Sequence, residues 1–200
     1  MARKPRAYTQ GMFVHVIARG NGGQPLFTDD ESRQYFLHEL LVASAEHGCK
    51  IHAYCLMTNH VHLLIETGER PISMLMHRVL FKFAQRFNRL GNTDGHVFQD
   101  RHKTIVCRTD AHLLAVLRYI HRNPVKAGLV TAPEQWPWSS ARAYLGEASP
   151  PGRDLLSALD ARRLSRRRGD LSRLHERPGP RAMAPRGSIE RRMGRRPDLS

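Results

Sequence analysis

Two apolar segments separated by only two residues constrain the fold of this chain most strongly. Residues 50–57 (KIHAYCLM) and 60–66 (HVHLLIE) both have strand-like composition, and only Thr58 and Asn59 lie between them. A connection of two residues joins antiparallel neighbours, so this stretch predicts a β-hairpin. An isolated hairpin is marginally stable in water, so further strands or helices must complete a sheet around it.

Further elements flank the hairpin in an informative order. Strands are predicted at residues 12–18 (MFVHVIA) and 103–107 (KTIVC). Helices are predicted from a cap at Asp29 or Asp30 to a stop at Gly48, at 72–90, and from Asp110 to a stop before Pro124. The order β-α-β-β-α-β plus an extra helix predicts an α+β, ferredoxin-like or RRM-like split βαβ fold. Its antiparallel sheet carries helices on one face and leaves the other face for a nucleic acid or the further helix.

The charge of the chain points to a polyanionic partner. Lys and Arg total 32 against 18 Asp and Glu, a formal net charge of +14, which favours nucleic acid. Residues 151–200 hold 14 of the arginines and 6 acidic residues but no Phe, Tyr or Trp. We therefore expect a folded domain at 1–150 and a disordered, Arg-rich tail at 151–200. The tail is either a phosphate-binding arm or a solvated extension.

Several functional classes lack their sequence signatures. No apolar run approaches the length of a membrane span. The three cysteines show no CxxC spacing, which fits a reducing cytoplasm. No HExxH sequence supports a zinc hydrolase, and no Gly-Lys pair supports a P-loop.

Two histidines two residues apart form the first candidate site. Because side chains alternate along a strand, His60 and His62 should share one face, with Val61 turned into the core. Neutral imidazoles placed in this way can bind a divalent cation. The same pair could also be two polar residues on a solvated face, and the spacing alone leaves both interpretations open.

A tyrosine and an asparagine form the second candidate site. Tyr119 and Asn123 are four residues apart, so they share one helical face. Tyr119 could simply fill the core and Asn123 end the helix. If His60 and His62 hold a metal, Tyr119 could instead supply a nucleophilic phenol and Asn123 a third, oxygen ligand.

Tyr54 is the rival nucleophile because it lies on the strand paired with the two histidines. Strict alternation places His52 and Tyr54 on one face and Ile51, Ala53 and Cys55 on the other. The pattern does not decide which of these faces meets the metal.

A basic and aromatic segment follows the second predicted helix. Arg101 and Lys103 lie close to Phe98, which predicts DNA contact with Phe98 stacked on a base. Alternatively, Phe98 belongs to the core and the segment is an exposed loop.

These motifs resemble a known family. HAYCLMTNHVHLLIE (52–66) resembles the HUH region of single-tyrosine transposases, and RYIHRNPVKAGLV (118–130) resembles the tyrosine helix of REP-associated tyrosine transposases, relatives of small insertion-sequence transposases. Similar segments occur in the same order at 11–27, 95–106 and 136–146, so the resemblance covers about residues 5–146. Thr58 stands where the family usually has proline, which alters a turn but no ligand.

The resemblance implies a specific chemistry. His60, His62 and Asn123 would bind Mg²⁺ or Mn²⁺, and Tyr119 would attack a DNA phosphate to give a 5′-phosphotyrosine. The substrate would be single-stranded DNA with hairpins such as repetitive extragenic palindromes. The chain would then be a cytoplasmic, nucleoid-associated transposase, monomeric or homodimeric, that cleaves and rejoins such strands.

The remaining predicted contacts are basic. On the tyrosine helix, Arg118, Arg122 and Lys126 are assigned to DNA binding alongside Phe98, Arg101 and Lys103. The alternative function is a non-catalytic module of the same fold that binds single-stranded nucleic acid. RNA-binding modules of this type carry stacking aromatics in an RNP1-type sequence, which this chain lacks.

Overall fold

The computed structural model describes residues 9–145. The predicted tail at 151–200 and its boundary at 150 lie outside this range. The strands are β1 (Phe13–Arg19), β2 (Lys50–Leu56), β3 (His60–Glu66) and β4 (Lys103–Val106). The α-helices are α1 (Asp30–His47), α2 (Ile72–Gly91), α3 (Asp110–Lys126) and α4 (Ala141–Leu145), and two short 3₁₀ helices, η1 and η2, span Asn21–Gly23 and Pro133–Gln135.

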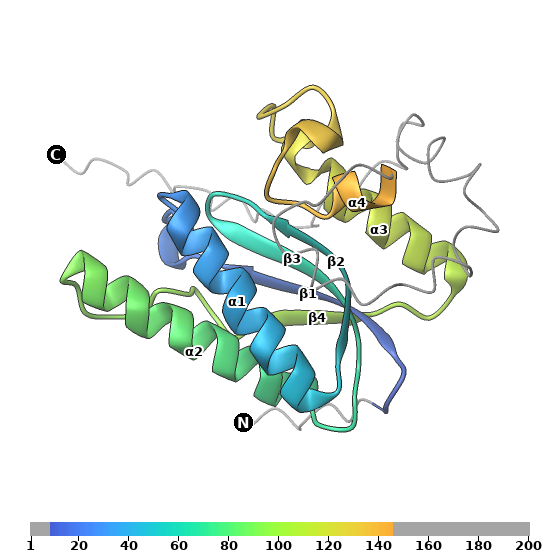
Figure 1. Cartoon of the computed structure of the whole chain (residues 1–200), viewed down its shortest axis with the longest axis horizontal. Helices are drawn as coiled ribbons and strands as arrows, with labels where there is room; N and C mark the ends of the chain where they lie inside the picture. The colour runs from blue at the N-terminus through green and yellow to red at the C-terminus, as the bar shows by residue number, and fades with distance from the viewer. Residues whose placement is uncertain (1–8, 146–200) are drawn as a thin grey trace, which may run out of the picture.

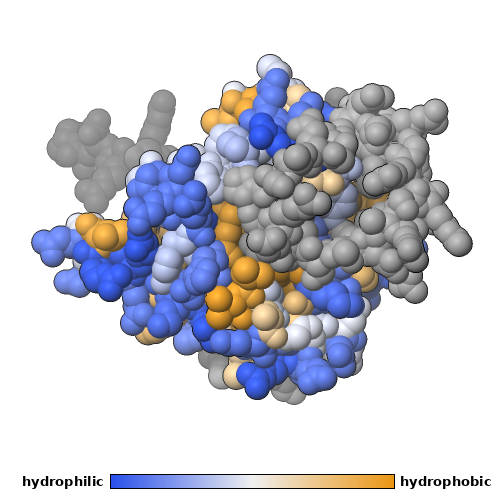
Figure 2. All heavy atoms as spheres, in the orientation of Figure 1, coloured by the Kyte–Doolittle hydropathy of each residue, from blue (hydrophilic) through white to orange (hydrophobic). Residues whose placement is uncertain are grey.

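The four strands form one antiparallel sheet in the order β2-β3-β1-β4. This order confirms the predicted ferredoxin-like α+β fold. α1 and α2 lie together on one face, and α3 lies across the other, as Figure 1 shows. In the same view the outer surfaces of α1 and α2 are largely hydrophilic (Figure 2). None of the helices within residues 9–145 has both the length and the apolar character to cross a bilayer.

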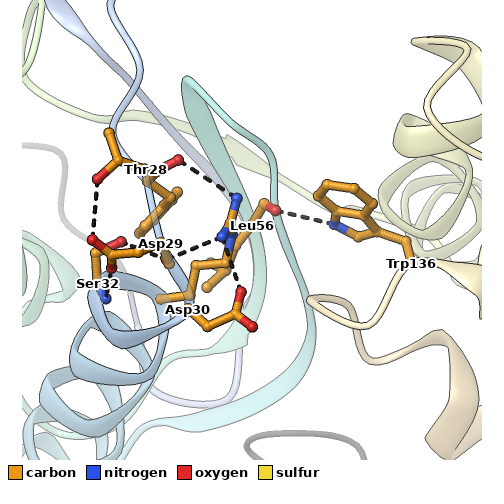
Figure 3. A network of polar contacts seen from close by, with 8 residues as sticks. Thr28, Asp29, Asp30, Ser32, Leu56 and Trp136 are labelled. Carbon is orange, nitrogen blue, oxygen red and sulfur yellow. Dashed lines mark hydrogen bonds and ion pairs between the residues drawn. The ribbon is translucent and has the colours of Figure 1, made fainter.

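The main core lies between the sheet and the helix pair α1 and α2. Three aromatic rings, Phe27, Phe36 and Phe83, meet edge to face at its centre, with centroids 5.3–5.7 Å apart. Asp29 fixes the start of α1, because its Oδ1 accepts a 2.7 Å hydrogen bond from the backbone N–H of Ser32 (Figure 3). This helix pair leaves the opposite sheet face to α3.

A second, smaller core attaches α3 to that opposite face. Leu117 and Ile120 of α3 pack against Ala53, Cys55 and Leu64 of the hairpin. This contact places the middle of α3 over β2 and β3, the strands of the histidine hairpin.

The segment after α3 closes over the edge of β2. The indole N–H of Trp136 donates to the carbonyl of Leu56 at 3.1 Å (Figure 3), and the N–H of Leu56 donates to the carbonyl of Trp138. His121 Nε2 lies 2.8 Å from Ser140 Oγ, joining this segment to α3. α3 is therefore held on the sheet of its own chain.

The predicted end of the third helix was wrong. α3 continues through Pro124 to Lys126, and Ala127 N–H then donates to the carbonyl of Asn123. Proline fits helical φ and costs chiefly one backbone hydrogen bond and a local kink. Pro124 is buried, so packing offsets part of that cost.

Strict alternation along β2 was also wrong. Ile51 pairs with Ile65 and Ala53 with Leu64, so His52 is the extra residue of a β-bulge. Ile51 and Tyr54 consequently share the face covered by α1 and α2, while Ala53 faces α3.

The α3 contact predicts a measurable stability effect. Ile120 is fully buried, so Ile120→Ala should lower the free energy of unfolding by about 2–4 kcal/mol through lost burial and a residual cavity. Urea denaturation measures this change. Leu129→Ala, at a residue 47% exposed, is the control and should change it by less than about 0.5 kcal/mol. Equal effects of the two substitutions would contradict the packing described.

Candidate active site

The hairpin presents both predicted histidines toward α3. Residues of β3 alternate between the two faces, with Val61 and Leu63 in the main core and Leu64 in the α3 core. The rings of His60 and His62 lie with centroids 4.9 Å apart and almost perpendicular. The two imidazoles therefore converge on one region beside α3.

α3 brings the tyrosine and asparagine to the same region. The Tyr119 ring lies edge to face against His62, with centroids 5.4 Å apart, and the tyrosine remains 37% exposed. Asn123 is buried beside His62, and its Nδ2 donates to the carbonyl of Tyr119 at 2.8 Å. Asn123 Oδ1 is thus the acceptor atom of this amide.

A lysine completes this face of α3. Lys126 Nζ lies 4.4 Å from the centroid of the Tyr119 ring. An ammonium at this position makes a cation–π contact with the ring.

The proton of His60 can be placed from its neighbours. Asn59 Nδ2 donates to the carbonyl of Gly23 at 3.1 Å, so Asn59 Oδ1 is the atom that accepts from His60 Nδ1 at 2.7 Å. His60 therefore carries its proton on Nδ1, and its Nε2 keeps a lone pair.

His62 has a neighbour that the sequence patterns did not single out. Nε2 of His15, on β1, lies 3.0 Å from Nδ1 of His62, and both side chains are buried. The Nδ1 atoms of both hairpin histidines are thus engaged by neighbours.

Burial keeps the site imidazoles neutral. Desolvation, with the charges of His15 and His60 as smaller contributions, lowers the pKa of His62 to about 2. Desolvation and then His112 lower the pKa of His15 to about 4. Burial and then Arg19 lower the pKa of His60. Neutral imidazoles are the form that binds metal ions.

The donor set fits a divalent cation. Within residues 9–145, no three His, Cys, Asp or Glu side chains form a potential metal-binding group. If His60 and His62 hold a cation, a third ligand would be of another type, and the amide of Asn123 lies beside His62. Two imidazole nitrogens and one amide oxygen would suit a divalent cation such as Mg²⁺ or Mn²⁺, which would supply positive charge beside Tyr119.

Tyr54 does not reach this region. It is fully buried in the main core, on the face covered by α1 and α2, and burial raises its pKa well above the usual range. Its phenol is therefore inaccessible to DNA, which leaves Tyr119 as the tyrosine beside the histidines.

The predicted DNA contacts divide into two groups. Phe98 is half-buried against Phe83 at the edge of the main core, with ring centroids 6.0 Å apart, a position that favours a packing role. Arg101 and Lys103 are exposed. Lys103 pairs with Ile17, and Ile17 pairs with His62. The side chain of Lys103 therefore lies on the same face of the sheet as His62, which we call the histidine face.

Two further predicted contacts lie on α3 itself. Arg118 precedes Tyr119 and Arg122 follows one turn later, and both are partly buried. DNA binding by these arginines, and base stacking by Phe98, remain predictions.

The sequence patterns missed two residues of β1. His15 contacts His62, and exposed Arg19 pairs with His60 across the sheet. Both occur at odd positions of β1, opposite the core residues Val14 and Val16. This two-residue period was the available signal, since it places polar side chains on the face away from the core.

The buried histidines predict that acid destabilises the protein. Between pH 6.5 and about 4, the unfolded chain binds protons at His15 and His62 that the folded chain does not. The free energy of unfolding should therefore fall as pH falls through this window, by up to about 1.4 kcal/mol per pH unit for each histidine. Urea midpoints at pH 7 and pH 5 measure this. An unchanged midpoint would contradict neutral, buried imidazoles.

Comparison with known proteins gives consistent results. The family model described as "Transposase IS200 like" matches residues 8–123, more than half of the chain. A REP-associated tyrosine transposase of Haemophilus influenzae is 31% identical over 99 residues, covering 44% of this chain and 56% of the relative. The match thus spans little more than half of that relative's length. A solved REP-associated tyrosine transposase bound to a REP hairpin superposes with a TM-score of 0.63 at 20% identity, covering 78% of this chain and 88% of the other, which shows the shared fold.

Proposed function

This chain belongs to the IS200-like transposase family, and on that premise we propose that it is a metal-dependent transposase that cleaves and rejoins single-stranded DNA near hairpins. The proposed reaction passes through a 5′-phosphotyrosine at Tyr119. One observation carries the proposal. On one face of the sheet, the ring centroids of His60 and His62 on β3 lie 4.9 Å apart, and that of Tyr119 on α3 lies 5.4 Å from that of His62.

The hydrogen bonds of the two histidines support an assignment of the metal-binding atoms. His60 and His62 both use Nδ1 toward protein neighbours, so their Nε2 atoms, with Asn123 Oδ1, would hold Mg²⁺ or Mn²⁺. When bound there, such an ion would supply positive charge that offsets the negative charge building up on the phosphate during displacement.

Tyr119 supplies the nucleophile. Its oxygen forms a bond to phosphorus while the bond from phosphorus to the 3′ oxygen breaks. The phenol loses one proton and the departing 3′ oxygen gains one, so no net proton is consumed. Lys126, above the ring, stabilises the negative charge on the phenol oxygen as the proton departs. The products are a 5′-phosphotyrosine and a free 3′-hydroxyl.

The reverse displacement rejoins DNA. A 3′-hydroxyl of another strand attacks the same phosphorus, and the tyrosine oxygen leaves and regains its proton. A phenol is a better leaving group than the serine hydroxyl because its pKa is lower. The energy of the phosphodiester is retained throughout, so strand transfer requires no nucleotide cofactor.

Exposed basic side chains on the histidine face would bind the phosphates of the DNA. Arg19 lies beside His60, Lys103 lies on the edge strand of the same face, and Lys126 lies beside Tyr119. Cations in this arrangement bind phosphates without reading sequence. The hairpin substrate is proposed from the relative that is bound to a REP hairpin.

A covalent capture experiment tests the proposal. The full chain is incubated with a single-stranded DNA that carries a hairpin and a 3′-terminal label on one arm, in Mn²⁺ or in EDTA. We expect a denaturation-resistant protein–DNA adduct that forms only with Mn²⁺. Hairpin binding without any adduct would instead identify a non-catalytic binding module.

A further inference from the structure

A further imidazole, which is buried, lies next to His62 and has no part in the chemistry proposed so far. His15 is 5% exposed, and its Nε2 is 3.0 Å from His62 Nδ1. Its ring also lies edge to face with the ring of Tyr119, with centroids 5.8 Å apart. His15 therefore contacts both the inner histidine and the tyrosine.

The position of the proton on the His62 ring determines which of the two histidines donates the hydrogen bond between them. An imidazole that gives Nε2 to a cation carries its proton on Nδ1, and a buried N–H needs an acceptor. His15 Nε2 is at hydrogen-bonding distance from that atom. His15 Nε2 can accept this hydrogen bond only when the proton of the His15 ring is on its Nδ1. Asn59 Oδ1 makes the equivalent contact with His60 Nδ1.

We propose that His15 is a positioning residue that accepts a hydrogen bond from His62 Nδ1, and so turns His62 Nε2 toward the cation beside Tyr119. The inference rests on the proposed function, because it requires a cation at His60 and His62. Partners of this kind fix the tautomer and orientation of a metal-binding histidine, and their loss weakens metal affinity about 10- to 100-fold.

Mn²⁺ affinity of the full chain tests this role without any DNA reaction. The dissociation constant is obtained from the electron paramagnetic resonance signal of free Mn²⁺. His15→Leu keeps a similar volume but removes the acceptor, and should weaken binding about 10- to 100-fold. His15→Gln places an amide oxygen at a similar reach and should restore most of the affinity.

A matched control separates positioning from packing. His47 is also buried, and its Nδ1 lies 2.8 Å from the carbonyl of Ala43 in α1, away from the histidine face. His47→Leu should leave the Mn²⁺ dissociation constant unchanged. If His15→Leu binds Mn²⁺ as tightly as the wild-type chain, His15 only fills space and the proposal is overturned.

A measurement on the wild-type protein covers the case in which His15→Leu fails to fold. Nitrogen-15 chemical shifts of the Mg²⁺-loaded protein report the protonation of each ring atom. We expect His15 protonated on Nδ1 and unprotonated on Nε2, with His62 protonated on Nδ1. A proton on His15 Nε2 would overturn the proposal.

The same titrations distinguish failure of this inference from failure of the proposed function. If the wild-type chain binds no Mn²⁺, or His60→Ala binds it equally well, the metal site itself is wrong and the proposal for His15 falls with it. If His60→Ala loses Mn²⁺ while His15→Leu keeps it, only the role of His15 is overturned.

Discussion

Tyr119→Phe should abolish the covalent protein–DNA adduct and lower strand cleavage by on the order of 10³-fold or more, because removal of a nucleophile leaves only the residual effect of binding. The ring that contacts His62 and Lys126 is retained, so the fold and hairpin affinity should change little. Gel analysis of denatured reactions containing labelled hairpin DNA and Mn²⁺ measures the adduct.

Tyr35→Phe is the matched control for this prediction. Tyr35 lies on α1, on the opposite side of the sheet, against Arg86. Removal of its hydroxyl should leave adduct formation at the wild-type level. An adduct that persists in Tyr119→Phe and disappears in Tyr35→Phe would show that the nucleophile is assigned wrongly.

His60→Ala should lower cleavage by on the order of 10²- to 10³-fold while hairpin binding persists. The loss of one ligand weakens the hold on the cation, whose stabilisation of the transition state amounts to several kcal/mol. The proposed phosphate contacts of Arg19, Lys103 and Lys126 would remain and maintain affinity. Cleavage rates and a fluorescence binding titration in the same buffer give the two quantities.

An exposed histidine elsewhere provides the control. His77 lies on α2, stacked on Phe81, and His77→Ala should keep both cleavage and binding. A His60→Ala protein that cleaves at the wild-type rate would remove His60 from the metal site. Circular dichroism and the urea midpoint establish that each variant is folded.

The regular parts of this fold were predictable from local patterns. The two-residue connection at Thr58 and Asn59 predicts the hairpin, and helical spacing predicts α1 and α2. The β-bulge at His52 was not predictable, because it depends on the pairing register with β3 rather than on β2 alone. The last turn of α3 was also not predicted, because burial of Pro124 outweighs the local tendency of proline to end a helix.

The site was predictable where its residues share an element. The spacing of His60 and His62 places both rings on one strand face, and that of Tyr119 and Asn123 places both on one helix face. The meeting of these faces depends on packing of Leu117 and Ile120 against the hairpin. Local periodicity contains no such information, so the family resemblance supplied it.

Contacts made across the sheet were the hardest to foresee. His15 and Arg19 approach the histidines only because β1 pairs with β3 in one particular register. Their residue types and two-residue spacing are suggestive, but their partners depend on the tertiary structure. The packing of Phe98 against Phe83 likewise depends on the tertiary structure, because the sequence shows only an aromatic residue beside basic residues.

The most direct measurement of the central claim is the mass of the peptide that carries DNA after the adduct is digested with nuclease and trypsin. Tyr119 lies between Arg118 and Arg122, so trypsin releases Tyr119–Arg122, which contains one tyrosine and no serine or threonine. We predict a nucleotide on this peptide, stable to acid as a phosphotyrosine is. A nucleotide on a peptide that contains any other tyrosine would contradict the convergence of Tyr119 with the histidine pair.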